Sequence, residues 1–315
     1  MPRTLLRILR WAFVLALIAA AGWALRGQLP AIREIAKSTQ LRWDLVALAA
    51  AIVLLTYALL IESWRRVIGA LGSSLDRAGA GYVWFVSNLA RWLPGAFWQL
   101  GAMTELARRR GVPITVSTSS AVIVTIVNVF TGLIVATAFM ATTPALLTAR
   151  GRIIIALGAV VLLAMPLVAP RAIALARRIT GRELVVPRIG FRAIAVAAVA
   201  TTGAWLAYGV AFWIMARAVL PGGWRDLPSC IAIYTASYLT GLFNPAPAGV
   251  GAAEGMIVLL APTLGVATPA EALVLAIVVR LWRTVLEIAP GLVALALGRS
   301  ADANDAQPSR GSRIP

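Results

Sequence analysis

The sequence predicts an all-α, polytopic integral membrane protein with about six full spans and two broken helical hairpins, about eight helical membrane segments together. Three observations carry this prediction. Hydrophobic residues make up 60% of the 315 residues, whereas charged residues make up only 13%. Many of the apolar runs are long enough to cross a bilayer. Two further apolar regions are interrupted near their middle by Pro/Gly clusters, which an unbroken helix does not tolerate.

The residue inventory excludes several kinds of site. Histidine is absent, which excludes a Ser-His-Asp triad, a Cys-His pair and HExxH zinc chemistry. The single cysteine, Cys230, excludes an internal disulfide and a cysteine metal cluster. We therefore expect no metal and no cofactor. The 29 basic residues are all Arg except Lys37 and lie in short clusters between apolar runs. This placement indicates membrane topology and contact with anionic lipid, and no nucleic-acid partner is expected.

Six apolar stretches are predicted to cross the membrane: residues 8–25, 45–61, 116–141, 153–169, 193–215 and 270–297. We interpret the first as a retained span, because no small-residue cleavage site with a polar segment behind it follows. The six stretches belong to one transmembrane domain, residues 1–298. The polar residues 299–315 are predicted to form a disordered tail.

The two broken regions are residues 80–106, interrupted at Pro94 and Gly95, and residues 228–266, interrupted around Pro245 and Pro247. Each is expected to form two half-helices around a bend, whose bare backbone needs protein or a watery cavity at membrane depth. Three spans separate the regions, so the sequence predicts an inverted internal repeat with hairpins that enter from opposite sides. Ordinary kinked hairpins, or pairs of short spans, are the alternative.

Arginine clusters set the expected orientation. They precede the first span, lie on both sides of the first broken region, and occupy the loop between spans 153–169 and 193–215. This pattern places both the N-terminus and the C-terminus in the cytoplasm of a cell (inner) membrane. The loop 26–44 departs from this pattern, because it holds four basic residues and must lie outside.

The last predicted span carries Arg280, Arg283 and Glu287 at spacings that place all three on one helical face. A charge at the bilayer centre costs roughly 2.5–3.5 kcal/mol on insertion scales. Arg283 and Glu287 are spaced to pair, and such a pair alone would be structural. Two arginines and one carboxylate nevertheless leave a positive charge, and the guanidinium fork suits a phosphate.

The segment 244–255 supplies further candidate substrate-binding residues: Asn244, Gly249, Gly251 and Glu254. A helix is expected to start near Ala252, with its free N–H groups directed into the bend. Glu254 then lies in the first turn. It either complements the helix dipole, or it acts as a proton-coupled carboxylate or as a partner of an arginine.

In the first broken region, Arg91 and Gln99 flank Pro94 and are also candidates for substrate contact. For Arg91, an extended side chain that reaches the membrane interface is the favoured interpretation. Polar residues of the third span are expected to make helix–helix hydrogen bonds: Ser119, Thr125, Asn128 and Thr131.

Two motifs carry a resemblance. The segments RWLPGAFWQLGAMTEL and SYLTGLFNPAPAGVGAAEG, the latter followed by an arginine-bearing span, resemble the transmembrane flippase region of lysylphosphatidylglycerol synthases and related stand-alone proteins. Ala248 stands where that family usually has a glycine. The resemblance implies movement of an anionic or zwitterionic phospholipid between leaflets. Only a short tail follows the last span, so lipid aminoacylation by this chain is not expected.

Three functions are weighed. The first is a translocator that moves an anionic or aminoacylated phospholipid between leaflets. The second is a membrane-embedded transferase with a lipid-linked donor, but the outer loop offers only Glu34 and Asp44, in no recognisable motif. The third is a non-transporting scaffold for a separately encoded lipid or glycan enzyme. The translocator is favoured, and the protein is not expected to be an enzyme.

Overall fold

The structure is a computed structural model that describes residues 41–93, 97–140, 190–220, 226–244 and 246–305. Every regular element in these residues is helical, which confirms the predicted fold class. The helices are α3 (Trp43–Ala70), α4 (Arg77–Leu89), η1 (Ala90–Trp92), α5 (Phe97–Arg108), α6 (Ile114–Met140), α8 (Phe191–Val219), α9 (Leu227–Phe243), η3 (Pro247–Gly249), α10 (Ala252–Thr263) and α11 (Pro269–Asp305).

Three helices, α3, α6 and α8, are long and apolar enough to cross a membrane. They contain the predicted spans 45–61 and 193–215 and residues 116–140 of the predicted span 116–141. Their outer faces expose large apolar side chains such as Leu55 and Val199, as lipid contact requires. The predicted last span lies within α11, which continues to Asp305, into the predicted tail. The predicted spans 8–25 and 153–169 lie outside the described residues.

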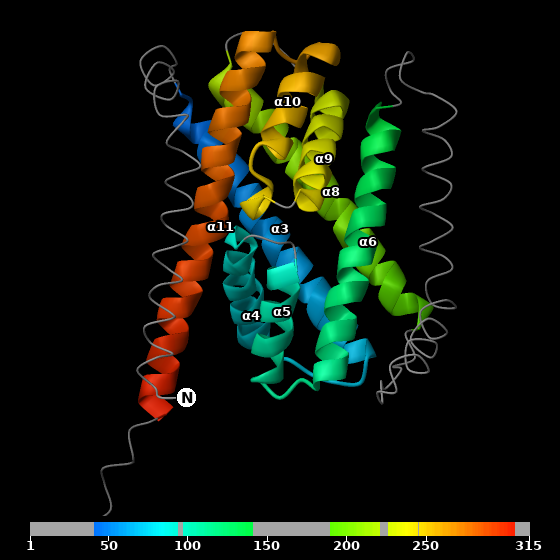
Figure 1. Cartoon of the computed structure of the whole chain (residues 1–315), viewed down its shortest axis with the longest axis vertical. Coiled ribbons are helices and arrows are strands. Elements are labelled where there is room, and N and C mark those ends of the chain that lie inside the picture. Colours follow the sequence, from blue (N-terminus) through cyan, green and yellow to red (C-terminus); the bar gives the residue numbers. More distant parts are fainter. Residues whose placement is uncertain (1–40, 94–96, 141–189, 221–225, 245, 306–315) are drawn as a thin grey trace, which may run out of the picture.

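The described α-helices form two units of four, α3–α6 and α8–α11. Corresponding helices of the two units run in opposite directions. In Figure 1, α6 begins at the lower end of the bundle and runs upward, whereas α11 begins at the upper end and runs downward. The packing is reciprocal, because α4 lies against α11 as α9 lies against α6, and α3 crosses α8. This is the arrangement of an inverted repeat, as the sequence predicts.

The two units also match in their segment lengths. Both α5 and α10 have 12 residues, and five residues then lead from each into the long helix that follows. Both hairpins begin at an aspartate cap. The side chain of Asp76 accepts a hydrogen bond from Gly79 N–H at the start of α4, and that of Asp226 accepts one from Ser229 N–H at the start of α9.

Both broken regions fold back on themselves. α4 packs against α5, and α9 packs against α10, so each region is a helical hairpin. In the first hairpin α4 ends at Leu89 and α5 begins at Phe97, with η1 between them; in the second α9 ends at Phe243 and α10 begins at Ala252, with η3 between them. The hairpins enter from opposite ends of the bundle, and their tips, η1 and η3, are in contact (Figure 1). Pro94, Gly95 and Pro245 lie outside the described residues.

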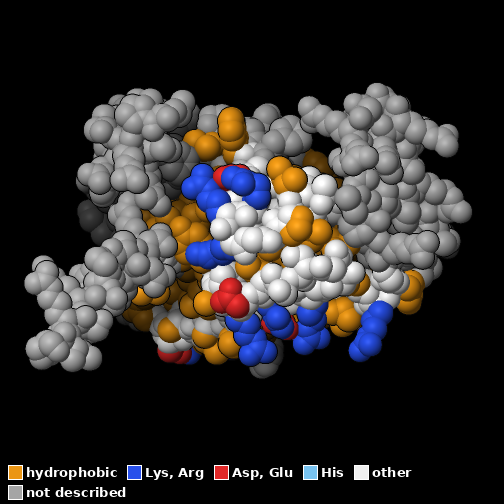
Figure 2. All heavy atoms as spheres, turned by 90° about the horizontal axis from the view of Figure 1, so that it is seen from below, with side chains coloured by type: hydrophobic (Ala, Val, Ile, Leu, Met, Phe, Trp, Pro, Cys, Tyr) orange, Lys and Arg blue, Asp and Glu red, His pale blue; other side chains and the backbone are white. Residues whose placement is uncertain are grey.

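Arginines gather at one end of the bundle, where α3 ends, α4 begins and α5 ends. They are Arg65, Arg66, Arg77, Arg108, Arg109 and Arg110. Figure 2, seen from this end, shows basic side chains on the face, interspersed with acidic ones. Near the end of α5, hydrogen bonds from Arg108 and Arg109 lower the pKa of Glu105 to about 2. At the opposite end of the bundle, the arginines among the described residues are Arg42, just before α3, and Arg217, in the last turn of α8.

Candidate functional site

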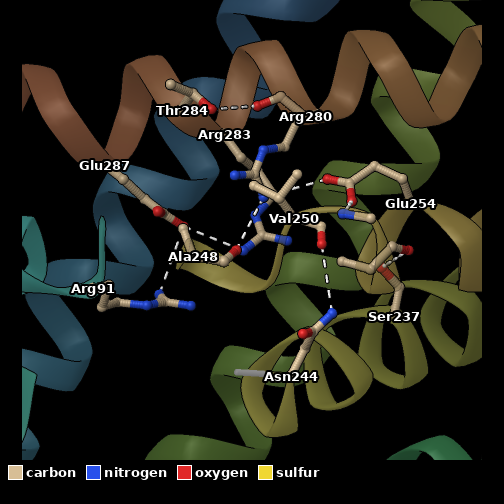
Figure 3. A network of polar contacts seen from close by, with 12 residues as sticks. Arg91, Ser237, Asn244, Ala248, Val250, Glu254, Arg280, Arg283, Thr284 and Glu287 are labelled. Atoms are coloured by element: carbon tan, nitrogen blue, oxygen red, sulfur yellow. Dashed lines mark hydrogen bonds and ion pairs between the residues drawn. The ribbon is translucent and has the colours of Figure 1, made fainter. Parts of the chain in front are cut away.

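Two arginines from opposite halves of the molecule share one carboxylate. Arg91 lies at the tip of the first hairpin, and Arg283 and Glu287 lie one turn apart on α11. Glu287 Oε1 is 3.6 Å from Arg91 NH1 and 3.2 Å from Arg283 NH2 (Figure 3). All three side chains are largely buried, with exposed fractions of 13% or 14% for the arginines and 8% for Glu287. They form a three-member cluster with one net positive charge.

Tyrosine side chains of α9 hold these guanidinium groups in place. Arg91 NH1 donates a hydrogen bond to the Tyr238 hydroxyl at 3.2 Å. The guanidinium carbons of Arg91 and Arg283 lie 5.3 and 5.1 Å from the centre of the same ring, and Arg283 also lies 5.8 Å from the ring of Tyr234. These distances are typical of cation–π contacts. Arg91 therefore points into the bundle, and the expectation that it extends to the interface is wrong.

A cavity of about 600 Å³ lies beside the cluster. Its wall is made by both halves of the molecule, from α3 to α6 and from α8, α9 and α11. Much of the wall is apolar, with Val53, Leu60, Leu100, Met103, Val124 and Val129. The polar part combines Arg91, Arg283 and Glu287 with neutral groups: Tyr57, Asn88, Gln99, Thr125, Asn128, Thr201, Tyr208, Tyr234, Tyr238 and Asn244. Such a cavity suits a ligand with one polar and one apolar part.

Arg280 and Glu254 form a second pair that is not on the wall of this cavity. Arg280 NH1 is 3.3 Å from Glu254 Oε1 and donates a hydrogen bond to the carbonyl oxygen of Ala248 at 3.0 Å. The guanidinium carbon also lies 5.2 Å from the ring centre of Trp92, at the tip of the other hairpin. The predicted set therefore divides: Arg283 and Glu287 face the cavity, whereas Arg280 and Glu254 tie α10 and the second tip to α11.

The second tip depends on backbone positions that favour glycine. α10 begins at Ala252 as expected, and Glu254 Oε2 accepts a hydrogen bond from Gly251 N–H at 2.6 Å. Glu254 thus caps the helix and pairs with an arginine, so two of its alternative roles are both present. Gly249 has φ 68° and Gly251 has φ 87°. A Cβ atom added at Gly249 would overlap the backbone of Gly241 on α9, so this position requires the close approach that only glycine permits.

Asn244 and Gln99 flank the cavity near the two tips. Asn244 Oδ1 accepts a hydrogen bond from Ala246 N–H at 2.9 Å, and its Nδ2 donates one to the carbonyl oxygen of Val250 at 3.4 Å. Gln99 Nε2 donates a hydrogen bond to Asn88 Oδ1 at 2.6 Å. Both predicted residues therefore position loop or helix ends and also present polar atoms to the cavity.

Several cavity residues escaped the sequence analysis. The four tyrosines and Asn88 have no distinctive spacing, and Thr125 and Asn128 were expected to bond between helices. Of that set, Thr131 does so, because its hydroxyl lies 3.1 Å from that of Thr201 on α8. Asn128 lines the cavity, and its backbone carbonyl oxygen accepts a hydrogen bond from Trp205 Nε1 on α8 at 3.1 Å.

Comparison with known protein families assigns the chain to a family of membrane proteins. No curated protein matches the chain closely enough to count as a relative. The family model described as the lysylphosphatidylglycerol synthase TM region matches residues 7–291, which include both hairpins, the cavity and the arginines of α11. The chain is a membrane protein, and it belongs to the lysylphosphatidylglycerol synthase transmembrane-region family.

Proposed function

We propose that the protein moves phospholipid between the two leaflets of the membrane, with the lipid phosphate held between Arg91 and Arg283. The observation that carries the proposal is the convergence of both guanidinium groups on one buried carboxylate oxygen atom beside the cavity. A phosphate oxygen is a stronger partner for a guanidinium fork than a single shared carboxylate oxygen.

The remainder of the cavity supports a lipid as the ligand. A water-soluble anion would need polar walls on all sides, but this cavity has a large apolar part, made by Val53, Leu60, Leu100, Met103, Val124 and Val129. The acyl chains of a lipid would lie against this part. The family name also refers to a lipid-modifying synthase, whose transmembrane region this chain resembles.

The inverted hairpins support movement as well as binding. In secondary transporters with inverted repeats, the binding site lies between broken helices near the bilayer midplane, and the repeats rock around it. Here the tips of the two hairpins meet beside the cavity, and each half contributes one of the two arginines. The arginine-rich end is proposed to face the cytoplasm of a cell membrane, together with both chain termini.

The test is lipid translocation by the purified protein in vesicles, measured as the accessibility of a tail-labelled anionic phospholipid in each leaflet. Arg283→Gln is expected to slow translocation by about tenfold to a hundredfold, the effect of losing a charge-assisted hydrogen bond. Arg283→Lys should recover only part of the rate, because the ammonium keeps the charge and loses the fork.

Arg109→Gln is the matched control, because Arg109 is exposed and shares Glu105 with Arg108 at the surface. It should translocate lipid at the wild-type rate. Wild-type rates in Arg283→Gln protein that elutes normally in size-exclusion chromatography would contradict the proposal. The transferase and scaffold functions would then return as candidates.

A further inference from the structure

We propose that the cavity selects headgroups by net charge. The class that fits is a phosphodiester with one negative charge and an uncharged polar headgroup, and Glu287 is the residue that sets this preference. The inference rests on the proposed function and names the substrate class of the same site.

The first step is the charge of the cavity wall. Among the described residues that line it, the charged ones are Arg91, Arg283 and Glu287, which leave one net positive charge. Arg280 lies nearby, but its charge is balanced by Glu254 at 3.3 Å. One negative charge on a ligand therefore brings the interior to neutrality.

The second step is the cost of any remaining charge. The three side chains are at least 86% buried, so water screens them poorly and an uncompensated charge is expensive. A phosphodiester with an uncharged headgroup leaves no net charge. A phosphomonoester with nearly two negative charges leaves an excess negative charge. A headgroup with an added ammonium, including an aminoacylated one, leaves an excess positive charge.

The third step is the position of Glu287. Its Oε1 atom contacts both guanidinium groups, so it occupies the place that a phosphate oxygen takes when lipid binds. The carboxylate lies one turn of α11 from Arg283, on the same helical face, and therefore remains beside the phosphate. There the Glu287 carboxylate repels a second negative charge on the ligand. Without it, the two arginines would favour a ligand with two negative charges over one with a single negative charge.

The fourth step concerns the uncharged part of the headgroup. The amide side chains of Asn88, Gln99 and Asn128 and the hydroxyl of Thr125 line the cavity. Amides and hydroxyls both donate and accept hydrogen bonds, so they suit headgroup hydroxyls. Apart from Glu287, the described lining residues offer no carboxylate to pair with an ammonium.

The experiment compares three tail-labelled probes in vesicles that contain the purified full-length chain: phosphatidylglycerol, phosphatidylethanolamine and phosphatidate. Their headgroups carry about one negative charge, no net charge, and nearly two negative charges. Wild-type protein is expected to move phosphatidylglycerol about tenfold faster than either of the other two lipids. An uncompensated buried charge weakens binding of a lipid by at least this factor. Protein-free vesicles give the background rate.

Charge variants of the site test the role of Glu287. Glu287→Gln raises the site charge to two positive charges, so phosphatidate should become the fastest probe. Arg91→Gln lowers the site charge to zero, so phosphatidylethanolamine should overtake phosphatidylglycerol. The Arg91→Gln/Glu287→Gln double variant returns the site to one positive charge, and phosphatidylglycerol should again be the fastest probe, at a lower rate.

Glu105→Gln is the matched control, because Glu105 is an ionised surface carboxylate and its replacement removes the same charge outside the cavity. It should keep the wild-type order of probes. Equal wild-type rates for the three probes would overturn the headgroup preference and leave translocation intact. A wild-type order in folded Glu287→Gln protein would overturn the role of Glu287. The absence of any protein-dependent movement would overturn both the proposed function and this inference.

Discussion

The two halves of the bundle use the same helical plan with different charges. Gln99 and Glu254 are each the third residue of a 12-residue helix, α5 and α10. Thr125 and Arg280 are each the twelfth residue of the long helix that follows, α6 or α11. In the first half these positions are neutral and line the cavity, whereas in the second half they are charged and pair with each other.

By the same matching of positions, Asn128 of α6 corresponds to Arg283 of α11, because each is the fifteenth residue of its helix. Both residues line the cavity, and Arg283 shares Glu287 with Arg91 of the other half of the molecule. Arg280, by contrast, is tied to Glu254 within its own half. Two arginines one turn apart on α11 thus have different tasks. Arg280 holds α10 to α11 and stacks on Trp92 of the first tip, whereas Arg283 shares Glu287 with Arg91 at the cavity.

The entry of the two hairpins from opposite sides of the membrane predicts the largest effect. It is tested by cysteine labelling, in which a position either reacts from a given side or does not. With Cys230 replaced by alanine, single cysteines at Arg77 and Arg109 should both react with an impermeant reagent from the cytoplasmic side. Cysteines at Asp226 and Thr268 should both react from the other side. These positions flank the first and second hairpins. Labelling of positions 77 and 109 from different sides would contradict a hairpin that folds back in the membrane.

The division of tasks between the arginines predicts a large loss of stability for Arg280→Gln. Removing one member of a buried ion pair costs about 3–5 kcal/mol, because the remaining charge is left without compensation. Arg280 and Glu254 are 8% and 14% exposed, so little of this cost is relieved by water. The measurement is the free energy of unfolding in detergent.

A double-mutant cycle separates the pair from other effects. Glu254→Gln should keep the hydrogen bond from Gly251 N–H, and Arg280→Gln/Glu254→Gln should be more stable than the sum of the two single losses implies. Strictly additive losses would show that the ion pair does not hold α10 to α11. Arg109→Gln again serves as the exposed arginine control.

The close approach of the second tip to α9 predicts a smaller loss for Gly249→Ala. The added methyl group overlaps the backbone of Gly241, and the residue must keep φ near 68°. Overpacking and left-handed geometry together cost about 2 kcal/mol or more. Thermal unfolding in detergent measures the loss. Gly255→Ala is the control, because an added Cβ meets no atom within 4 Å there, and it should be at least as stable as wild type.

Much of the fold could be predicted because the bilayer imposes strong rules on sequence. Charge-free runs gave α3, α6 and α8, and Pro/Gly clusters gave the two breaks. The start of α10 at Ala252 and its cap at Glu254 followed from local chemistry. The position-by-position match between the halves could not be predicted, because residues at matching positions, such as Gln99 and Glu254, differ in chemical type.

The site could be predicted only in part, because a sequence shows which side chains are charged but not where each side chain points. Arg283 and Glu287 were expected to pair, and they do, at 3.2 Å. The inward direction of Arg91 depends on Tyr238 and Glu287, which are far from it in the sequence. The separation of Arg280 from the cavity likewise depends on where the second tip lies, which no helical spacing reveals.

The smallest expected effect concerns Ala248, in the second hairpin tip. Its backbone has φ 48° and ψ 27°, a left-handed conformation that costs a residue with a side chain about 1–2 kcal/mol. Ala248→Gly should therefore raise the free energy of unfolding, by about 1 kcal/mol or less, because the freer unfolded chain offsets part of the gain. The hydrogen bond from Arg280 NH1 ends on the backbone oxygen of this residue, so the substitution should leave it and the translocation rate unchanged. A lower thermal midpoint in detergent would contradict this, and would mean that the Ala248 methyl group, which packs against the Leu89 and Trp92 cluster of the first tip, contributes more than its backbone conformation costs.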